Sequence, residues 1–123
     1  LRTFKDINMA YDLLTMDHHS VVSITEIDFP PSLSLLKTKE DLISSLDPSK
    51  PWENGDSRSQ DHATAYKPNG AIYGMWSESF SIYENFYTPT TIGYEMPANR
   101  SIDIDTALDM EIAEIILKKN EKN

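Results

Sequence analysis

Hydrophobic residues at helical spacing open the chain. The positions at i, i+3, i+4 and i+7 are Ile7, Ala10, Tyr11 and Leu14. This spacing predicts an amphipathic helix over about residues 4–16, and the T-x-x-D pattern of Thr3 and Asp6 is typical of a helix start. The β-branched stretch SVVSITEI at 20–27 predicts a largely buried strand. A helix that leads into such a strand suggests a βαβ unit whose first strand would precede residue 1.

The last part of the chain repeats this mixture of strands and helices. Short apolar runs predict strands at 71–75 and 91–96, and a weak helical pattern covers 78–85. One face of a final helix is marked by Leu108, Ile112, Ile115 and Ile116. Together these elements predict an α/β fold.

Residues 28–68 interrupt the pattern. Repeated prolines and the Asn54-Gly55 pair separate short apolar pieces. The segment is too long for a plain loop, so we expect that it has its own structure or contacts a partner. We treat it as an excursion from the main sheet.

Composition narrows the class of protein. The chain has 123 residues, is 39% hydrophobic and carries a net charge of -9. This charge disfavours a nucleic-acid backbone as the main partner. No apolar run approaches the roughly 18 residues that a membrane span needs. Cysteine is absent, which excludes disulfides and thiolate metal sites and fits a cytoplasmic location.

Two aspartates precede the final helix in RSIDIDTALD. In an extended segment Asp103 and Asp105 would point to one side, and Ile102 and Ile104 would point to the other, toward a core. One interpretation is helix capping by Asp105 or Thr106. The other is a Mg²⁺ site, since two carboxylates suit this ion where substrate phosphates complete the coordination. The spacing alone leaves both interpretations open.

Other polar and aromatic residues also have two interpretations. The Lys67-Pro68-Asn69-Gly70 sequence is typical of a turn, and the Asn69 amide could instead line a pocket. Lys37 and Arg58 are either solvated or able to hold a carboxylate substrate. The aromatic residues that crowd the next stretch form either core or a pocket wall: Phe80, Tyr83, Phe86 and Tyr87.

Four motifs occur in the order of one enzyme family. They are SVVS at 20–23, RSQD at 58–61, YKPNGAIY at 66–73 and SIDIDTALDMEIAE at 101–114. The chain resembles the CMP-N-acetylneuraminic acid synthetases, also called acylneuraminate cytidylyltransferases. The resemblance implies the C-terminal part of a Rossmann-like nucleotidyltransferase fold, of the nucleotide-diphospho-sugar transferase type. It also implies a homodimer in which the segment 28–66 contacts the partner.

The family joins CTP and a sialic acid to give CMP-sialic acid and pyrophosphate. By this resemblance, Asp103 and Asp105 match the family's catalytic Mg²⁺-binding aspartates, and Tyr73, Phe86 and Tyr87 match positions that line the sugar pocket. The remaining substrate-binding positions carried over from the family are Lys37, Arg58, Gln60, Lys67 and Asn69. Lys67 stands where the family often has arginine.

Two departures from the family pattern qualify these expectations. Where the family often reads RRQD, this chain has Ser59, and Arg58 is the residue expected to replace the missing arginine. The preferred sugar is therefore open to other eight-carbon or nine-carbon keto acids. The family's glycine-rich and basic CTP-binding loop has no counterpart in the sequence, so we expect the isolated chain to have little or no synthetase activity. The alternative is a non-catalytic dimerisation or interaction module.

Overall fold

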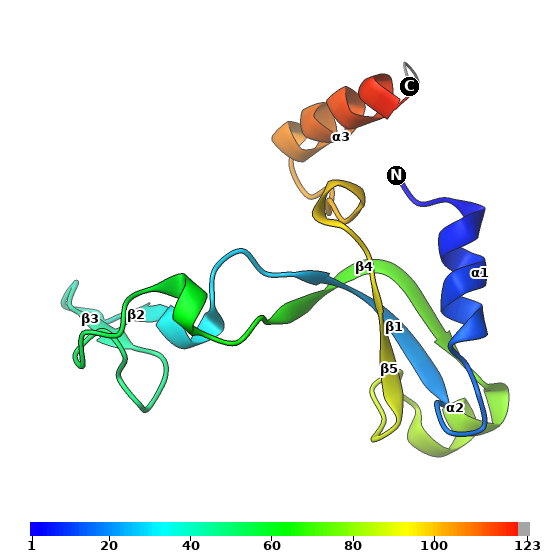
Figure 1. The fold of residues 1–123 in the computed structure, drawn as a ribbon, viewed down its shortest axis with the longest axis horizontal. Coiled ribbons are helices and arrows are strands. Elements are labelled where there is room, and N and C mark those ends of the chain that lie inside the picture. Colours follow the sequence, from blue (N-terminus) through cyan, green and yellow to red (C-terminus); the bar gives the residue numbers. More distant parts are fainter. Residues whose placement is uncertain (121–123) are drawn as a thin grey trace. The chain divides into compact units, whose positions relative to one another are not determined.

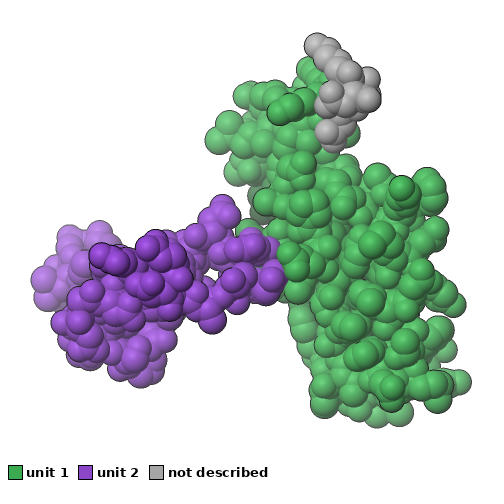
Figure 2. Space-filling view, viewed as in Figure 1, with its two compact units in different colours: residues 1–25, 67–123 green, residues 26–66 purple. Residues whose placement is uncertain are grey.

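The computed structural model describes residues 1–120 and divides the chain into two compact units. Unit 1 comprises Leu1–Thr25 and Lys67–Asn123, and unit 2 comprises Glu26–Tyr66 (Figure 2). Unit 2 covers most of the range 28–68 that the prolines set apart in the sequence, and all of the segment 28–66 that the resemblance implies. Its role in dimerisation stays a prediction.

Unit 1 is built on a three-stranded sheet in the order β4-β1-β5, with β1 (Ser20–Glu26) in the centre (Figure 1). Strand β5 (Thr91–Glu95) runs parallel to β1, whereas β4 (Tyr66–Met75) runs antiparallel to it (Figure 1). Just beyond the end of β4, the backbone N–H of Trp76 donates to O of His19, the residue before β1, at 3.2 Å. This mixed sheet with helices confirms the predicted α/β class. The Rossmann-like assignment stays a prediction.

The central strand is the most buried element of unit 1. Residues 20–23 are all buried, because β1 has a strand on each side and side chains on both faces, so the prediction of a largely buried strand is confirmed. Gly93 of β5 allows close packing, because a Cβ at this position would lie 2.6 Å from Ile24 Cδ1. The buried hydrophobic cluster consists of Ala10, Val21, Tyr94 and Met96.

The first helix is shorter than predicted, and only part of its predicted apolar face is buried. Helix α1 spans Phe4–Asp12, so the prediction of a helix to residue 16 is wrong at its end. The Thr15 hydroxyl accepts the N–H groups of Asp17 and His18 at 3.2 and 3.1 Å, a local turn that competes with helix continuation. Ile7 and Tyr11 are exposed, while Asp6 and Ala10 are buried.

The later elements occur where the sequence predicted them. The strand expected at 71–75 is the end of β4, helix α2 spans Ser77–Tyr83, and helix α3 spans Ala107–Asn120. The predicted apolar face of α3 is largely exposed, and Ala113 is the buried residue of this helix among those described. The spacing of apolar residues in the sequence therefore predicts the helix correctly, but it does not show which face of the helix is buried. None of the helices in residues 1–120 combines the length and apolar character needed to cross a membrane.

Unit 2 has secondary structure of its own, which is one of the two alternatives that the sequence left open. Strands β2 (Leu35–Lys37) and β3 (Ile43–Ser45) form an antiparallel hairpin, with Leu35 opposite Ser45. Two short 3-10 helices, η1 (Pro31–Leu33) and η2 (Ser59–Asp61), complete the unit. The indole N–H of Trp52 donates to Leu33 O at 2.7 Å and ties the following turn to η1.

Candidate active site

Asp103 and Asp105 lie on a short irregular segment between η3 (Ala98–Arg100) and helix α3. Both residues are exposed, and within residues 1–120 neither carboxylate has a hydrogen bond or ion pair. Ile102 is half-buried, but Ile104 is 47% exposed. The prediction that both isoleucines face a core is therefore wrong for Ile104, because the segment is not a regular strand.

The C-terminal end of this segment is held by a helix cap. The Thr106 hydroxyl accepts the backbone N–H of Asp109 at 3.2 Å and donates to Asp109 Oδ2 at 2.7 Å. The backbone N–H groups of Thr106 and Asp105 also donate to this carboxylate, at 2.8 and 3.2 Å. These hydrogen bonds, those of Thr106 first, lower the pKa of Asp109. Of the two capping interpretations, Thr106 is confirmed, so capping does not occupy the carboxylates of Asp103 and Asp105.

The N-terminal end is held by a buried ion pair that sequence reasoning missed. Arg100 Nη1 lies 2.6 Å from both carboxylate oxygens of Asp6, whose side chain is 2% exposed. The Tyr94 hydroxyl donates to Asp6 at 2.9 Å, and the Thr3 backbone N–H and hydroxyl each donate at 2.8 Å. Burial alone would raise the pKa of Asp6, but the hydrogen bonds from Thr3, Tyr94 and Arg100 lower it to about 2. The T-x-x-D pattern was the only signal of this site.

A second anchor joins strands β1 and β4 to the same segment. Asn69 is 3% exposed, and its Oδ1 accepts the Ser23 hydroxyl at 2.6 Å and the Ala71 N–H at 3.1 Å. Asn69 Nδ2 donates to the Ser101 hydroxyl oxygen at 2.8 Å. Gly70, within strand β4, adopts φ +68, a left-handed conformation that favours glycine. Because Lys67, Pro68, Asn69 and Gly70 all lie within strand β4, the prediction of a turn at these residues is wrong.

A polar pocket of about 270 Å³ borders the aspartate segment. Its lining residues are Leu1, Arg2, Arg100, Ile102, Asp103 and Ile104. Two arginines and one aspartate therefore share a single cavity. Guanidinium groups bind phosphate oxygens well, often through two hydrogen bonds.

The donor atoms at Asp103 and Asp105 fit a magnesium ion. Residues 1–120 contain no group of three or more His, Cys, Asp or Glu side chains that could enclose a metal. Mg²⁺ does not need such a group, since it is commonly held by one or two carboxylates together with water and substrate phosphates. Two exposed carboxylates without protein partners meet this requirement.

Three aromatic residues expected in the sugar pocket are brought together by the fold. The rings of Tyr73 and Phe86 are 5.5 Å apart, and Phe86 lies 5.9 Å from Phe80. Tyr87 has a hydrogen bond with Tyr73, and burial first, then this hydrogen bond, raises the pKa of Tyr87. Tyr73 and Tyr87 are 42% and 53% exposed, so the cluster presents an aromatic surface rather than a closed core. Lys67, on the same strand as Tyr73, is exposed.

The other predicted site residues belong to unit 2. Lys37 forms an exposed ion pair with Asp41, at 2.6 Å. Arg58 is exposed and precedes η2, in which Gln60 borders a polar pocket of about 270 Å³. His62 lines the same pocket, and its Nδ1 lies 2.9 Å from the Ser32 hydroxyl. The participation of Lys37, Arg58 and Gln60 in one site with Asp103 stays a prediction.

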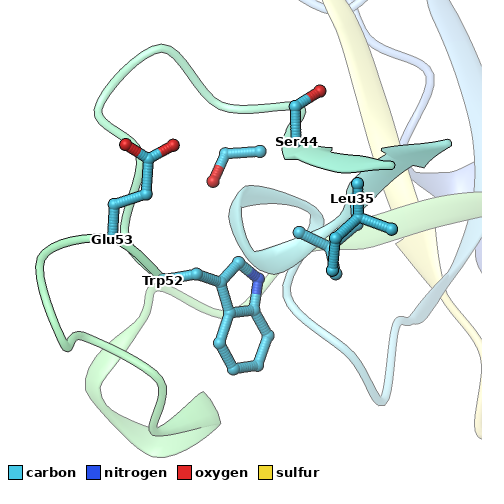
Figure 3. Close-up of a pocket in the computed structure, with 6 residues that line it drawn as sticks. Leu35, Ser44, Trp52 and Glu53 are labelled. Carbon is cyan, nitrogen blue, oxygen red and sulfur yellow. The ribbon is translucent and has the colours of Figure 1, made fainter. Parts of the chain in front are cut away.

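Unit 2 also contains a pocket of about 300 Å³ that sequence reasoning missed (Figure 3). Its lining residues are Leu35, Ile43, Ser44, Ser45, Trp52 and Glu53. The Trp52 ring and the Leu35 side chain border one side of the cavity (Figure 3). Most of the exposed area of the lining is apolar. The signal in the sequence is a tryptophan within an otherwise polar turn.

Comparison with known proteins identifies similar curated sequences, although no family model matches the chain. The chain is 33% identical over 94 residues to the N-acylneuraminate cytidylyltransferase of Streptococcus agalactiae serotype III (strain NEM316). It is 27% identical over 121 residues to the pseudaminic acid cytidylyltransferase of Campylobacter jejuni subsp. jejuni serotype O:2. These matches cover 76% and 97% of this chain, but only 22% and 50% of the two relatives. The chain thus spans half or less of the length of these relatives.

Proposed function

We propose that this chain, whose resemblance to the CMP-sialic acid synthetase family is supported by its curated relatives, forms part of an enzyme that activates a sialic-type sugar acid with CTP. The relatives are cytidylyltransferases for sugars of this type. The observation that carries the proposal is the pair of free carboxylates, Asp103 and Asp105, on a segment that is anchored at Ser101 and ends at the local cap of α3. If this segment were only a solvated connecting loop, it would not need the hydrogen bond from Asn69 to Ser101 or the helix cap at Thr106.

In the proposed reaction, Asp103 and Asp105 hold Mg²⁺, which neutralises phosphate charge when bound. The anomeric hydroxyl of the sugar forms a bond to the α-phosphorus of CTP, and the bond to pyrophosphate breaks. Arg2 and Arg100 line the pocket beside Asp103, so their guanidinium groups are suited to contact the phosphate oxygens. The chain thereby supplies positive charge close to its own carboxylates.

The aromatic surface of Tyr73, Phe86 and Tyr87 supports a role as the sugar-side wall. Lys67, on the same strand as Tyr73, would contact the polar part of the sugar. The two relatives are named for different sugar acids, and Ser59 replaces an arginine of the family pattern. We therefore propose a keto-sugar acid of the sialic type as the substrate class, without choosing among its members. A cytoplasmic location is proposed with this function.

The test is pyrophosphate release from CTP in a chimaera. In it, this chain replaces the matching residues of the Campylobacter jejuni relative, and Mg²⁺ and keto-sugar acids are supplied. Asp103→Ala and Asp105→Ala should each lower kcat/KM about a hundredfold or more, since a metal ligand contributes several kcal/mol to the transition state. Asp17→Ala removes an exposed carboxylate elsewhere in unit 1 and should change little.

Two results would contradict parts of the proposal. Full activity of the Asp103→Ala and Asp105→Ala chimaeras would exclude the metal assignment. Robust CMP-sugar formation by the 123 residues alone would exclude the expectation that the isolated chain is nearly inactive.

A second function, a dimerisation or interaction module, is favoured by the surface of unit 2. Leu36, Leu42, Ile43 and Leu46 are each at least 51% exposed, in addition to the pocket shown in Figure 3. Exposed apolar residues in such a small unit are typical of a contact surface. We expect a homodimer by light scattering after size exclusion, and Leu42→Asp should dissociate it. Ile82→Asp, at an exposed apolar position of unit 1, is the matched control. A monomeric wild-type chain would contradict the dimer.

A further inference from the structure

We propose that Asn69 and Ser101 are positioning residues, which hold the segment of Asp103 and Asp105 in the conformation that binds metal. The inference rests on the proposed function, because it takes the two aspartates as the metal ligands. It assigns Asn69 a role different from the substrate contact that the family resemblance implies. Ser101 has had no assigned role.

The hydrogen bonds of Asn69 leave little of its amide for a substrate. Its oxygen accepts two hydrogen bonds, from Ser23 in β1 and from the Ala71 backbone, and its nitrogen donates to Ser101. The residue is 3% exposed. A buried amide with these partners supports its neighbours, and removal of a partner would leave a buried polar group unpaired.

Ser101 transmits this support to the aspartates. Its hydroxyl accepts from Asn69 at 2.8 Å and can donate to Pro97 O at 3.0 Å. Asp103 follows only two residues later, and one residue spans at most about 3.6 Å of chain. At the other end of the segment, Thr106 and Asp109 form the local cap of α3. The hydrogen bonds of Ser101 therefore limit the backbone conformations that are open to the residues directly after it.

Convergence of two carboxylates on one ion is sensitive to such support. Residues that orient metal ligands through hydrogen bonds typically change metal affinity by about tenfold to a hundredfold when they are mutated. Loss of the Ser101 hydroxyl should therefore weaken metal binding while both ligands and the sheet remain. A residue with only a structural role would change stability without this selective loss.

The experiment is a titration of the whole 123-residue chain with Mn²⁺ alone, used as a paramagnetic substitute for Mg²⁺. The measurement is the broadening of the amide NMR signals of residues 102–106. The variants are Ser101→Ala, Ser101→Thr and Asn69→Ala, with Asp103→Ala as the reference for loss of a ligand. Ser81→Ala is the matched control, because the Ser81 hydroxyl bonds to Ser77 O within α2, away from the segment.

We expect saturable broadening centred on Asp103 and Asp105 in the wild type and in Ser81→Ala. In Ser101→Ala, about tenfold or more Mn²⁺ should be needed to reach half of the maximal broadening. The amide signals of the rest of unit 1 should stay well dispersed, which shows that the variant is folded. Ser101→Thr retains a hydroxyl and should restore binding. Asn69→Ala should resemble Ser101→Ala. If it unfolds, Ser101→Ala decides the test alone.

Two contrary outcomes have different meanings. If Ser101→Ala binds Mn²⁺ like the wild type while Asp103→Ala has lost binding, the positioning role is wrong and the metal site stands. If Asp103→Ala binds like the wild type, the aspartates are not the ligands, and both the proposed metal site and this inference are wrong.

Discussion

The two units place their polar and apolar residues in opposite ways. Unit 1 buries Asp6, Ser23 and Asn69, each hydrogen-bonded, beside a hydrophobic cluster that includes Met96. Unit 2 leaves Leu42 and Ile43 67% and 69% exposed. A buried polar group is tolerated only when its partners are fixed, whereas exposed apolar surface is unfavourable until something covers it. The interior of unit 1 thus supports the segment of the proposed site, and the surface of unit 2 suits the proposed contact.

The comparison is tested most strongly by removing one large apolar side chain from each unit. Met96→Ala should lower the free energy of unfolding by about 4 kcal/mol, because Met96 is 1% exposed and its loss leaves a cavity. Leu42→Ala should change it by less than about 0.5 kcal/mol in the monomer. Urea denaturation followed by fluorescence measures both, since Trp76 lies in unit 1 and Trp52 in unit 2. Equal effects would contradict the contrast between the units.

The ion pairs of the two units offer the next test. Arg100→Met should cost about 3 kcal/mol, because it leaves the buried Asp6 carboxylate without its cation. Lys37→Met breaks an ion pair whose side chains are 68% and 81% exposed, and should cost less than about 1 kcal/mol. Thermal unfolding of both variants gives the comparison. A larger effect of Lys37→Met would show that unit 2 depends on its surface charges.

The same ion pair predicts how stability varies with pH. The pKa of Asp6 falls from an ordinary value of 3.8 to about 2 in the folded chain. A lowered pKa gives stability that is fully present above about pH 4 and is lost as the pH falls through 2. The contribution is about 2 kcal/mol. Denaturation midpoints between pH 2 and 6 should show this slope, and Asp6→Asn should remove it. A slope that persists in Asp6→Asn must come from other carboxyl groups.

The smallest effect concerns the exposed cap of α3. Thr106→Ala should lower stability by about 1 kcal/mol, because the backbone N–H of Asp109 loses its partner, while Thr106→Ser should be nearly neutral. Circular dichroism during thermal unfolding measures the difference. If the two variants behaved alike, the hydroxyl would have no capping role.

The sequence predicted elements better than contacts. The β-branched, largely apolar composition of 20–27 predicted β1, and the prolines marked most of unit 2, because both signals are local. The buried face of α1 was predicted only in part: Ala10 is buried as predicted, but burial of Asp6 depends on Arg100, which local patterns cannot link to it. The Asp103 and Asp105 pair was visible as a motif, but its support by Asn69 and Ser101 was not, since buried polar networks leave no periodic signal.

The bond between Asp6 and Arg100 joins residues 94 positions apart in the chain. Such a contact closes a long loop of the chain. Loop closure costs conformational entropy, and this cost arises before the contact can stabilise the fold. During synthesis, α1 and β1 emerge from the ribosome well before Arg100, so Asp6 must wait for its partner. Assembly of the aspartate segment is then expected among the last folding events, so the proposed metal ligands of a newly made chain would come into place only after the sheet has formed.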